Sequence, residues 1–156
     1  MEKRQEILFS QMRTYRMELL QLAKSFTEEE ADIIPQGFRN NLRWNLGHVF
    51  LDQYLWIQAL TKEEAPIPNG FKNWFSYGTT PTDFTANTPA FTHLLSLLQA
   101  QPGQIFERYA DHIDKEYPAI DMGMETIEQV LIRTIFHEGM HLQAILDIKK
   151  ALSRKI

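Results

Sequence analysis

Residues 127–152 read IEQVLIRTIFHEGMHLQAILDIKKAL, and apolar side chains recur in this run every three or four residues. That spacing places them on one face of an α-helix. The resulting stripe consists of Val130, Thr134, His137, His141, Ile145, Ile148 and Leu152. We therefore predict a long helix that buries this face against other helices and carries two histidines on the buried side.

His137 and His141 lie about one helical turn apart, which brings their Cβ atoms to within about 5–6 Å of each other. Two imidazoles at this separation can bind one metal ion. Two histidines in place of consecutive core residues are unfavourable unless something satisfies their nitrogens. We interpret the pair as metal ligands. The alternatives are a hydrogen-bonded pair of core histidines, or a face more exposed than the stripe indicates.

Three other segments carry the same helical periodicity, and no segment alternates with the period of two that a strand needs. A short additional helix is expected after Thr27, because this threonine and the three glutamates that follow it resemble a capping box. The four long helices are predicted at approximately residues 2–26, 41–60, 88–113 and 124–153.

Local signals set the expected helix boundaries. Asn41 is a favourable N-cap for the second long helix. Thr88 is the expected N-cap of the third, with Pro89 at its first position. Pro102 and Gly103 should kink or split the third helix, because proline lacks the backbone N–H and clashes with the preceding turn.

The connection between the second and third long helices, residues 61–87, is long and repeatedly interrupted by proline and glycine. It is also rich in aromatic side chains, which a flexible tether would not carry. It could form a lid over a site or cover the core. Its length permits a crossover, so the two helices can run parallel. We predict an all-α fold, with one four-helix-bundle domain over residues 1–156 and a long crossover connection between helices two and three.

The composition is that of an ordinary globular protein, with 44% hydrophobic residues. The net charge of −4 argues against nucleic-acid binding, which normally shows as a basic patch. No apolar run is long enough to span a membrane and no leader is recognisable, so we expect no membrane partner and a cytoplasmic protein. The chain has no cysteine, so thiol chemistry would need a thiol supplied from outside.

A third metal ligand is expected on the second long helix, where His48 takes the place of an apolar residue. The stripe around it consists of Trp44, His48, Leu51 and Leu55. Three histidines with an open coordination position are typical of catalytic zinc sites, and nickel or iron would also accept them. His93 and His112 replace no stripe residue and are left out. We expect Asp52 to face solvent; the alternative is that it orients the His48 imidazole.

Residues 137–141 spell HEGMH, which matches the HExxH signature of metalloproteases. The rest of the chain does not support a protease, because Ala144 and Asp147 stand where the metzincin extension needs glycine and histidine. A di-iron carboxylate site is also disfavoured, because it needs two Glu-x-x-His units and the chain has one. Glu138 remains open as a general base, a partner of a ligand, or half of an ion pair with an arginine such as Arg133.

The whole chain resembles the DinB-like family of small metal-binding four-helix bundles. Residues 45–48, Asn-Leu-Gly-His, resemble the first histidine motif of that family, and His137 and His141 match its histidine pair. The resemblance implies a divalent metal ion, nickel or zinc with iron as the alternative, held by His48, His137 and His141. It also implies frequent homodimerisation. Leu142 and Gln143 differ from the residues that follow the last histidine in many members of the family. This difference affects what the resemblance implies about the substrate side of the pocket more than what it implies about the metal.

Some relatives in this family are S-transferases or isomerases that use small thiols such as bacillithiol or mycothiol. A metal in an open three-histidine site can lower the pKa of a bound thiol, which fits a protein without cysteine. Our functional hypothesis is a metal-binding protein that transfers a small thiol to an electrophile, with no catalytic residue identified beyond the ligands. The competing hypothesis is a stress-associated metal-binding or structural protein without turnover.

Overall fold

The computed structural model describes residues 1–153, and within that part of the chain it contains helices and no strand. The all-α prediction is confirmed. The four long helices are α1 (Lys3–Ala23), α3 (Leu42–Thr61), α5 (Phe91–Tyr109) and α6 (Ile127–Ser153). The short elements are α2 (Glu28–Asp32), α4 (Phe71–Phe75) and the 3₁₀ turns η1 (Pro81–Asp83), η2 (Ala110–His112) and η3 (Asp121–Gly123).

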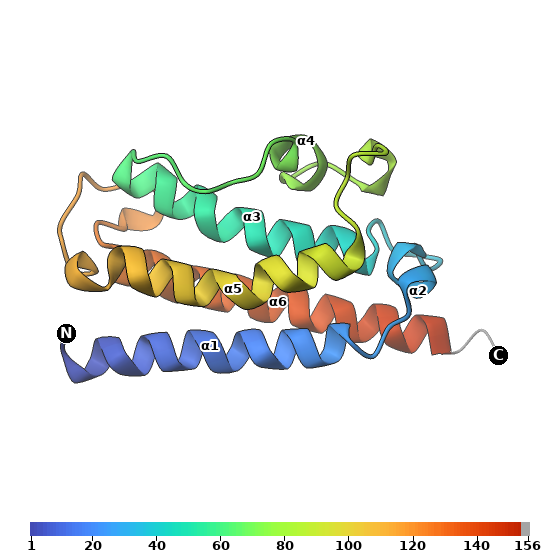
Figure 1. Cartoon of the computed structure of the whole chain (residues 1–156), viewed down its shortest axis with the longest axis horizontal. Coiled ribbons are helices and arrows are strands. Elements are labelled where there is room, and N and C mark those ends of the chain that lie inside the picture. Colours follow the sequence, from blue (N-terminus) through green and yellow to red (C-terminus); the bar gives the residue numbers. More distant parts are fainter. Residues whose placement is uncertain (154–156) are drawn as a thin grey trace.

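The four long helices form a bundle with the predicted crossover (Figure 1). Helices α1 and α6 run in one direction, and α3 and α5 run in the other. Because α3 and α5 are parallel, residues 62–90 must return along the outside of α3 before α5 begins. Helix α1 packs against α5 and α6, and α3 packs against the same two helices, so α1 and α3 occupy opposite corners.

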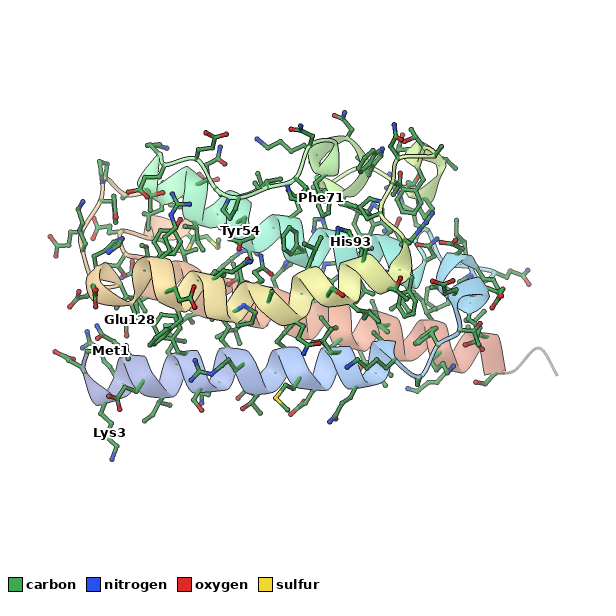
Figure 2. All side chains as sticks on the ribbon, in the orientation of Figure 1. Met1, Lys3, Tyr54, Phe71, His93 and Glu128 are labelled. Carbon is green, nitrogen blue, oxygen red and sulfur yellow. The ribbon has the colours of Figure 1, made fainter. Side chains whose placement is uncertain are left out.

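The crossover connection is packed onto α3 through aromatic side chains. Phe71 and Phe75 of α4 are buried, and the ring of Phe75 lies directly over Gly47, where a Cβ atom would overlap it. Phe71 lies 5.4 Å from Phe50 of α3 between ring centroids. Figure 2 labels Phe71 on α4 and Tyr54 on α3, the two sides of this layer. The connection therefore covers one side of the core and comes close to the helix that carries His48.

Helix α5 begins later than the sequence indicates. The prediction that Thr88 caps it and that Pro89 opens it was wrong, because α5 starts at Phe91. The hydroxyl of Thr88 instead accepts a hydrogen bond from the Thr85 backbone N–H at 2.8 Å. Thr88 therefore closes the turn before the helix. A threonine hydroxyl can bond to the backbone of a turn as well as it can cap a helix.

Pro102 does not split α5, which continues from Phe91 to Tyr109. A proline inside a helix leaves the carbonyl four residues earlier without its usual partner. That carbonyl belongs to Leu98, and it accepts a hydrogen bond from Nη1 of Arg16 at 2.8 Å. The side chain from α1 therefore satisfies the group that the proline frees.

None of the helices in residues 1–153 has the length and apolar composition that a bilayer crossing requires.

Candidate metal centre

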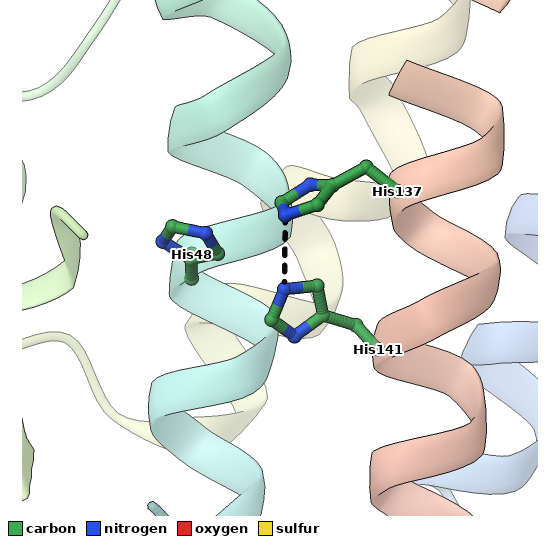
Figure 3. Close-up of side chains that lie close together, drawn as sticks. All are labelled: His48, His137 and His141. Atoms are coloured by element: carbon green, nitrogen blue, oxygen red, sulfur yellow. Dashed lines mark hydrogen bonds between the residues drawn. The ribbon is translucent and has the colours of Figure 1, made fainter. Parts of the chain in front are cut away.

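The three histidines predicted as ligands lie together between α3 and α6 (Figure 3). His48 projects from α3, and His137 and His141 project from α6. One ring nitrogen from each can be chosen so that all three lie within 4.8 Å of one another. His93 is exposed on α5 (Figure 2) and His112 lies in η2, and neither belongs to this cluster.

The rotation of α6 differs from the one that the sequence suggested. Its buried stripe passes through Thr134 and Glu138, whereas His137 and His141 are half-buried at the edge that faces α3. Spacings of three and four residues fit two neighbouring stripes of one helix. Because α6 packs against both α1 and α3, it buries the stripe through Glu138 and leaves the histidine stripe at the edge. The alternative of a more exposed histidine face was thus partly correct, although both rings still lie close to the ring of His48 on α3.

Each imidazole is held through its Nδ1 atom by a different acceptor. His48 donates to the backbone carbonyl of Phe75 at 2.6 Å. His137 donates to Oδ2 of Asp52 at 2.9 Å. The acceptor for His141 is Oδ1 of Asn45, at 2.7 Å.

These acceptors determine which nitrogen of each ring carries the proton. A carbonyl or carboxylate oxygen can only accept, so Nδ1 of His48 and of His137 must be protonated. The Asn45 amide is fixed because its Nδ2 donates to the Asn41 carbonyl at 2.7 Å, which leaves Oδ1 toward His141. In its neutral form, each of the three imidazoles therefore presents an unprotonated Nε2 with a free lone pair.

Two of the free nitrogens are spaced as metal ligands are. The Nε2 atoms of His137 and His141 lie 3.3 Å apart (dashed line in Figure 3). Two nitrogens that each lie about 2.0–2.1 Å from a tetrahedral metal ion are separated by about 3.3–3.4 Å. With the proton of each ring on Nδ1, the contact drawn in Figure 3 has no donor, and a cation between the two lone pairs would satisfy both. The cluster could hold a metal ion, and its donor set fits one.

The electrostatics favour the neutral rings that a metal requires. Burial, together with the neighbouring imidazoles, lowers the pKa of His141 to about 3. Burial also lowers the pKa of His48. These two rings therefore favour the neutral form, and a metal ion would not have to displace a proton from Nε2.

We expect the free energy of unfolding of the metal-free protein to fall as the pH drops from about 6.5 toward about 3. In this pH window His141 is protonated in the unfolded chain but neutral in the folded protein, so acid favours unfolding. Urea denaturation at several pH values across the window measures the effect. A free energy of unfolding that stays constant over the upper half of the window in wild type would contradict this account of His141.

Asp52 is a structural partner of the cluster, contrary to the expectation that it faces solvent. Its Oδ2 accepts from His137 and also from Nη1 of Arg133 at 2.6 Å, and its Oδ1 accepts from Trp56 at 3.2 Å. Burial alone would raise the pKa of Asp52, but the hydrogen bond from His137 and the nearby positive charges lower it overall. The charged carboxylate thus orients His137, and not His48 as the alternative had proposed.

Glu138, the glutamate of the HExxH match, is buried in the bundle and faces α1. It forms a two-point ion pair with Arg16 of α1, in which Nε and Nη2 lie 2.7 and 2.9 Å from its two oxygens. Both side chains are almost fully buried. The partner is Arg16 and not Arg133, and a carboxylate committed to this pair is not available as a general base on a metal-bound water.

Arg16 ties all four long helices together. It bonds to Gln53 on α3 at 3.2 Å and to Gln101 on α5 at 3.0 Å, besides the Leu98 carbonyl and Glu138 of α6. Every donor nitrogen of the guanidinium has a partner, as a buried charge requires. This network fixes α6 in the rotation that turns its histidines toward α3.

The motif at residues 45–48 has a physical role at three of its four positions. Asn45 holds His141, Gly47 makes room for the Phe75 ring, and the carbonyl of Phe75 holds His48. From the sequence, residues 45–48 are recognised together as a family motif, but only His48 is given a role. A glycine and a buried asparagine inside a helix, both disfavoured there, were the available signals.

We predict that Gly47→Ala destabilises the protein by about 1–3 kcal/mol and weakens metal binding, because the new methyl group displaces Phe75 and its carbonyl. Gly139→Ala in α6 is the control, since nothing lies near its Cβ position and alanine favours a helix. Thermal unfolding and metal titration measure the two effects. If Gly47→Ala bound metal as tightly as Gly139→Ala, the role assigned to the Phe75 carbonyl would be wrong.

The chain also matches a known protein family. The sequence model of the DinB superfamily matches residues 11–145, which is most of the chain. The chain belongs to the DinB superfamily. Among solved structures, this DinB protein resembles the crystal structure of a conserved protein from Enterococcus faecalis, with a TM-score of 0.71 and 18% sequence identity over 99% of this chain and 100% of that one. At this identity the likeness shows the fold alone. Comparison with curated proteins gives no match.

Proposed function

We propose that this protein binds one divalent metal ion, nickel or zinc, through Nε2 of His48, His137 and His141, and uses it to transfer a small thiol to an electrophile. The observation that carries the metal proposal is that one ring nitrogen of each histidine lies within 4.8 Å of the others, while Nδ1 of every ring is held by an acceptor. Three imidazoles leave at least one coordination position open, which is the composition of catalytic and not of structural sites.

The residues of the chain would orient the ion and its ligand. Asp52, Asn45 and the Phe75 carbonyl fix the three rings, so binding requires little reorganisation. A bound divalent metal would supply Lewis acidity, which lowers the pKa of a thiol at the open position. Trp44 stacks on His48 with ring centroids 4.7 Å apart and shields that side of the site.

The thiol must come from outside, because the chain contains no cysteine. In the proposed reaction the thiolate sulfur forms a bond to an electrophilic carbon. The leaving group departs from that carbon with the bonding electron pair, and the thiol proton passes to solvent. No external oxidant or reductant is needed.

The test is consumption of a small thiol with chlorodinitrobenzene by zinc-loaded and nickel-loaded protein. We expect a rate that depends on metal and disappears in His141→Ala, while His93→Ala keeps it because His93 is exposed on α5. If several thiols give no metal-dependent rate although metal is bound, the protein is a metal-binding protein without this turnover, which is the competing hypothesis.

We also propose that two copies of the chain associate through the outer face of α6. Ile132, Phe136 and Met140 follow one another at four-residue spacing and are all exposed, Phe136 at 71%. Phe136 and Met140 also line a cavity of about 460 Å³ between α1 and α6, together with Tyr15. Exposed apolar surface of this kind marks interaction sites.

Phe136→Glu should shift the mass measured by light scattering from dimer to monomer, because it places a charge in the centre of that face. Tyr77→Glu is the control, since Tyr77 is 96% exposed on the crossover connection. A wild-type protein that is monomeric at the same concentration would contradict the association.

A further inference from the structure

Arg133 stands beside the histidine cluster in a fixed orientation. Its Nη1 lies 2.6 Å from Oδ2 of Asp52, the same oxygen that holds His137. Its Cζ lies 4.5 Å from the centre of the Trp56 ring, and the Trp56 N–H bonds to the other oxygen of Asp52. Asp52 thus connects the guanidinium to the proposed ligand His137. The Trp56 ring and the Asp52 carboxylate together fix the position of the guanidinium.

Most of the hydrogen-bonding capacity of Arg133 is not used within residues 1–153. Its bond runs from Nη1 alone, which leaves Nε and Nη2 without a protein partner there. Those two nitrogens form one edge of the guanidinium, and such an edge binds a carboxylate with two parallel hydrogen bonds. Arg16 uses the same edge for Glu138 in this protein. The Arg133 side chain is 23% exposed, so it is partly open to solvent.

The charges around the cluster favour an anionic ligand. Asp52 and Arg133 offset each other, and the three imidazoles are neutral when they bind metal. The charge of a divalent ion would therefore remain uncompensated, and its field would attract anions. A ligand with one anionic group on the metal and a second on the free edge of Arg133 would balance the two positive charges of the ion.

We propose that Arg133 binds a carboxylate of the thiol substrate, so that the site selects small thiols that carry a carboxylate over neutral thiols. This inference rests on the proposed function, because it assumes that the thiol sulfur takes the open position on the metal. Arg133 contacts the substrate and not the ion, which makes it a specificity-determining residue.

The experiment uses cobalt-substituted protein and two thiols with the same chain length, mercaptoacetate and mercaptoethanol. Binding is followed by the sulfur-to-cobalt charge-transfer absorption and is expressed per bound cobalt. We expect wild type to bind mercaptoacetate about tenfold more tightly than mercaptoethanol, as one charge-assisted carboxylate contact allows. In Arg133→Met the preference should disappear while mercaptoethanol still binds.

The matched control is Arg43→Met. Arg43 is also ion-paired, with Asp32 at 2.8 Å, and also stacks on a ring, with its Cζ 4.6 Å from the centre of Phe84. This variant should keep the wild-type preference. Equal affinity of wild type for both thiols, or a preference that survives in Arg133→Met, would overturn the role of Arg133 and leave the thiol proposal standing. No charge-transfer band with either thiol would overturn both.

Discussion

His48→Ala should lower the affinity for zinc or nickel by more than about 100-fold, because loss of even a hydrogen-bond partner of a ligand costs about 10–100-fold. The variant keeps His137 and His141 on α6 but loses the imidazole from α3. Two neighbouring histidines on one helix form only a weak site. Competition with a chromophoric chelator measures the affinity, and plasma mass spectrometry measures the metal that remains bound after purification.

His93→Ala is the matched control for this prediction, because it removes an exposed imidazole from the same bundle. We expect its metal affinity to equal that of wild type. The ligand assignment would be wrong if His93→Ala lost metal, or if His48→Ala kept wild-type affinity while remaining folded by circular dichroism.

Arg16→Met should reduce the free energy of unfolding by about 3–5 kcal/mol, the range found when one partner of a buried ion pair is removed. Arg16 is 1% exposed, and its loss leaves Glu138 as an unpaired charge inside the bundle. It also leaves the carbonyl of Leu98 without a donor, since Pro102 cannot supply one. Urea denaturation of the metal-free protein measures the change.

The double variant Arg16→Met/Glu138→Leu separates the charge from the packing. Replacement of both partners by apolar side chains is often neutral or stabilising. We expect it to recover most of the stability lost in Arg16→Met. If the double variant were less stable than the single one, the unpaired carboxylate would not be the cause. Its metal affinity should remain below that of wild type, because Glu138 no longer sets the rotation of α6.

Helix periodicity was sufficient to predict the bundle and the three clustered histidines. The spacing within each helix places His48 on one face of α3 and the histidine pair near one face of α6, and the crossover follows from the length of residues 61–87. These features depend on local spacing and chain length, which a single sequence contains.

The partners of the histidines depend on tertiary packing and could not be read in the same way. Asp52 lies four residues after His48, so the sequence suggests that pair, but packing of α3 against α6 places it on His137. The acceptor for His48 is the backbone carbonyl of Phe75, which every residue type carries, so no residue in the sequence could indicate it. The bond from Arg16 to Leu98 joins residues that are 82 positions apart, and it explains why Pro102 is tolerated.

X-ray absorption of the zinc-loaded protein tests the central claim most directly, because it reports the atoms bound to the ion. The three-histidine site predicts about one zinc per chain, with three imidazole nitrogens at about 2.0–2.1 Å and the remaining position filled by a light atom from solvent. A folded protein that takes up no zinc, or a zinc shell with fewer than three imidazoles, would show that these histidines do not form a metal centre.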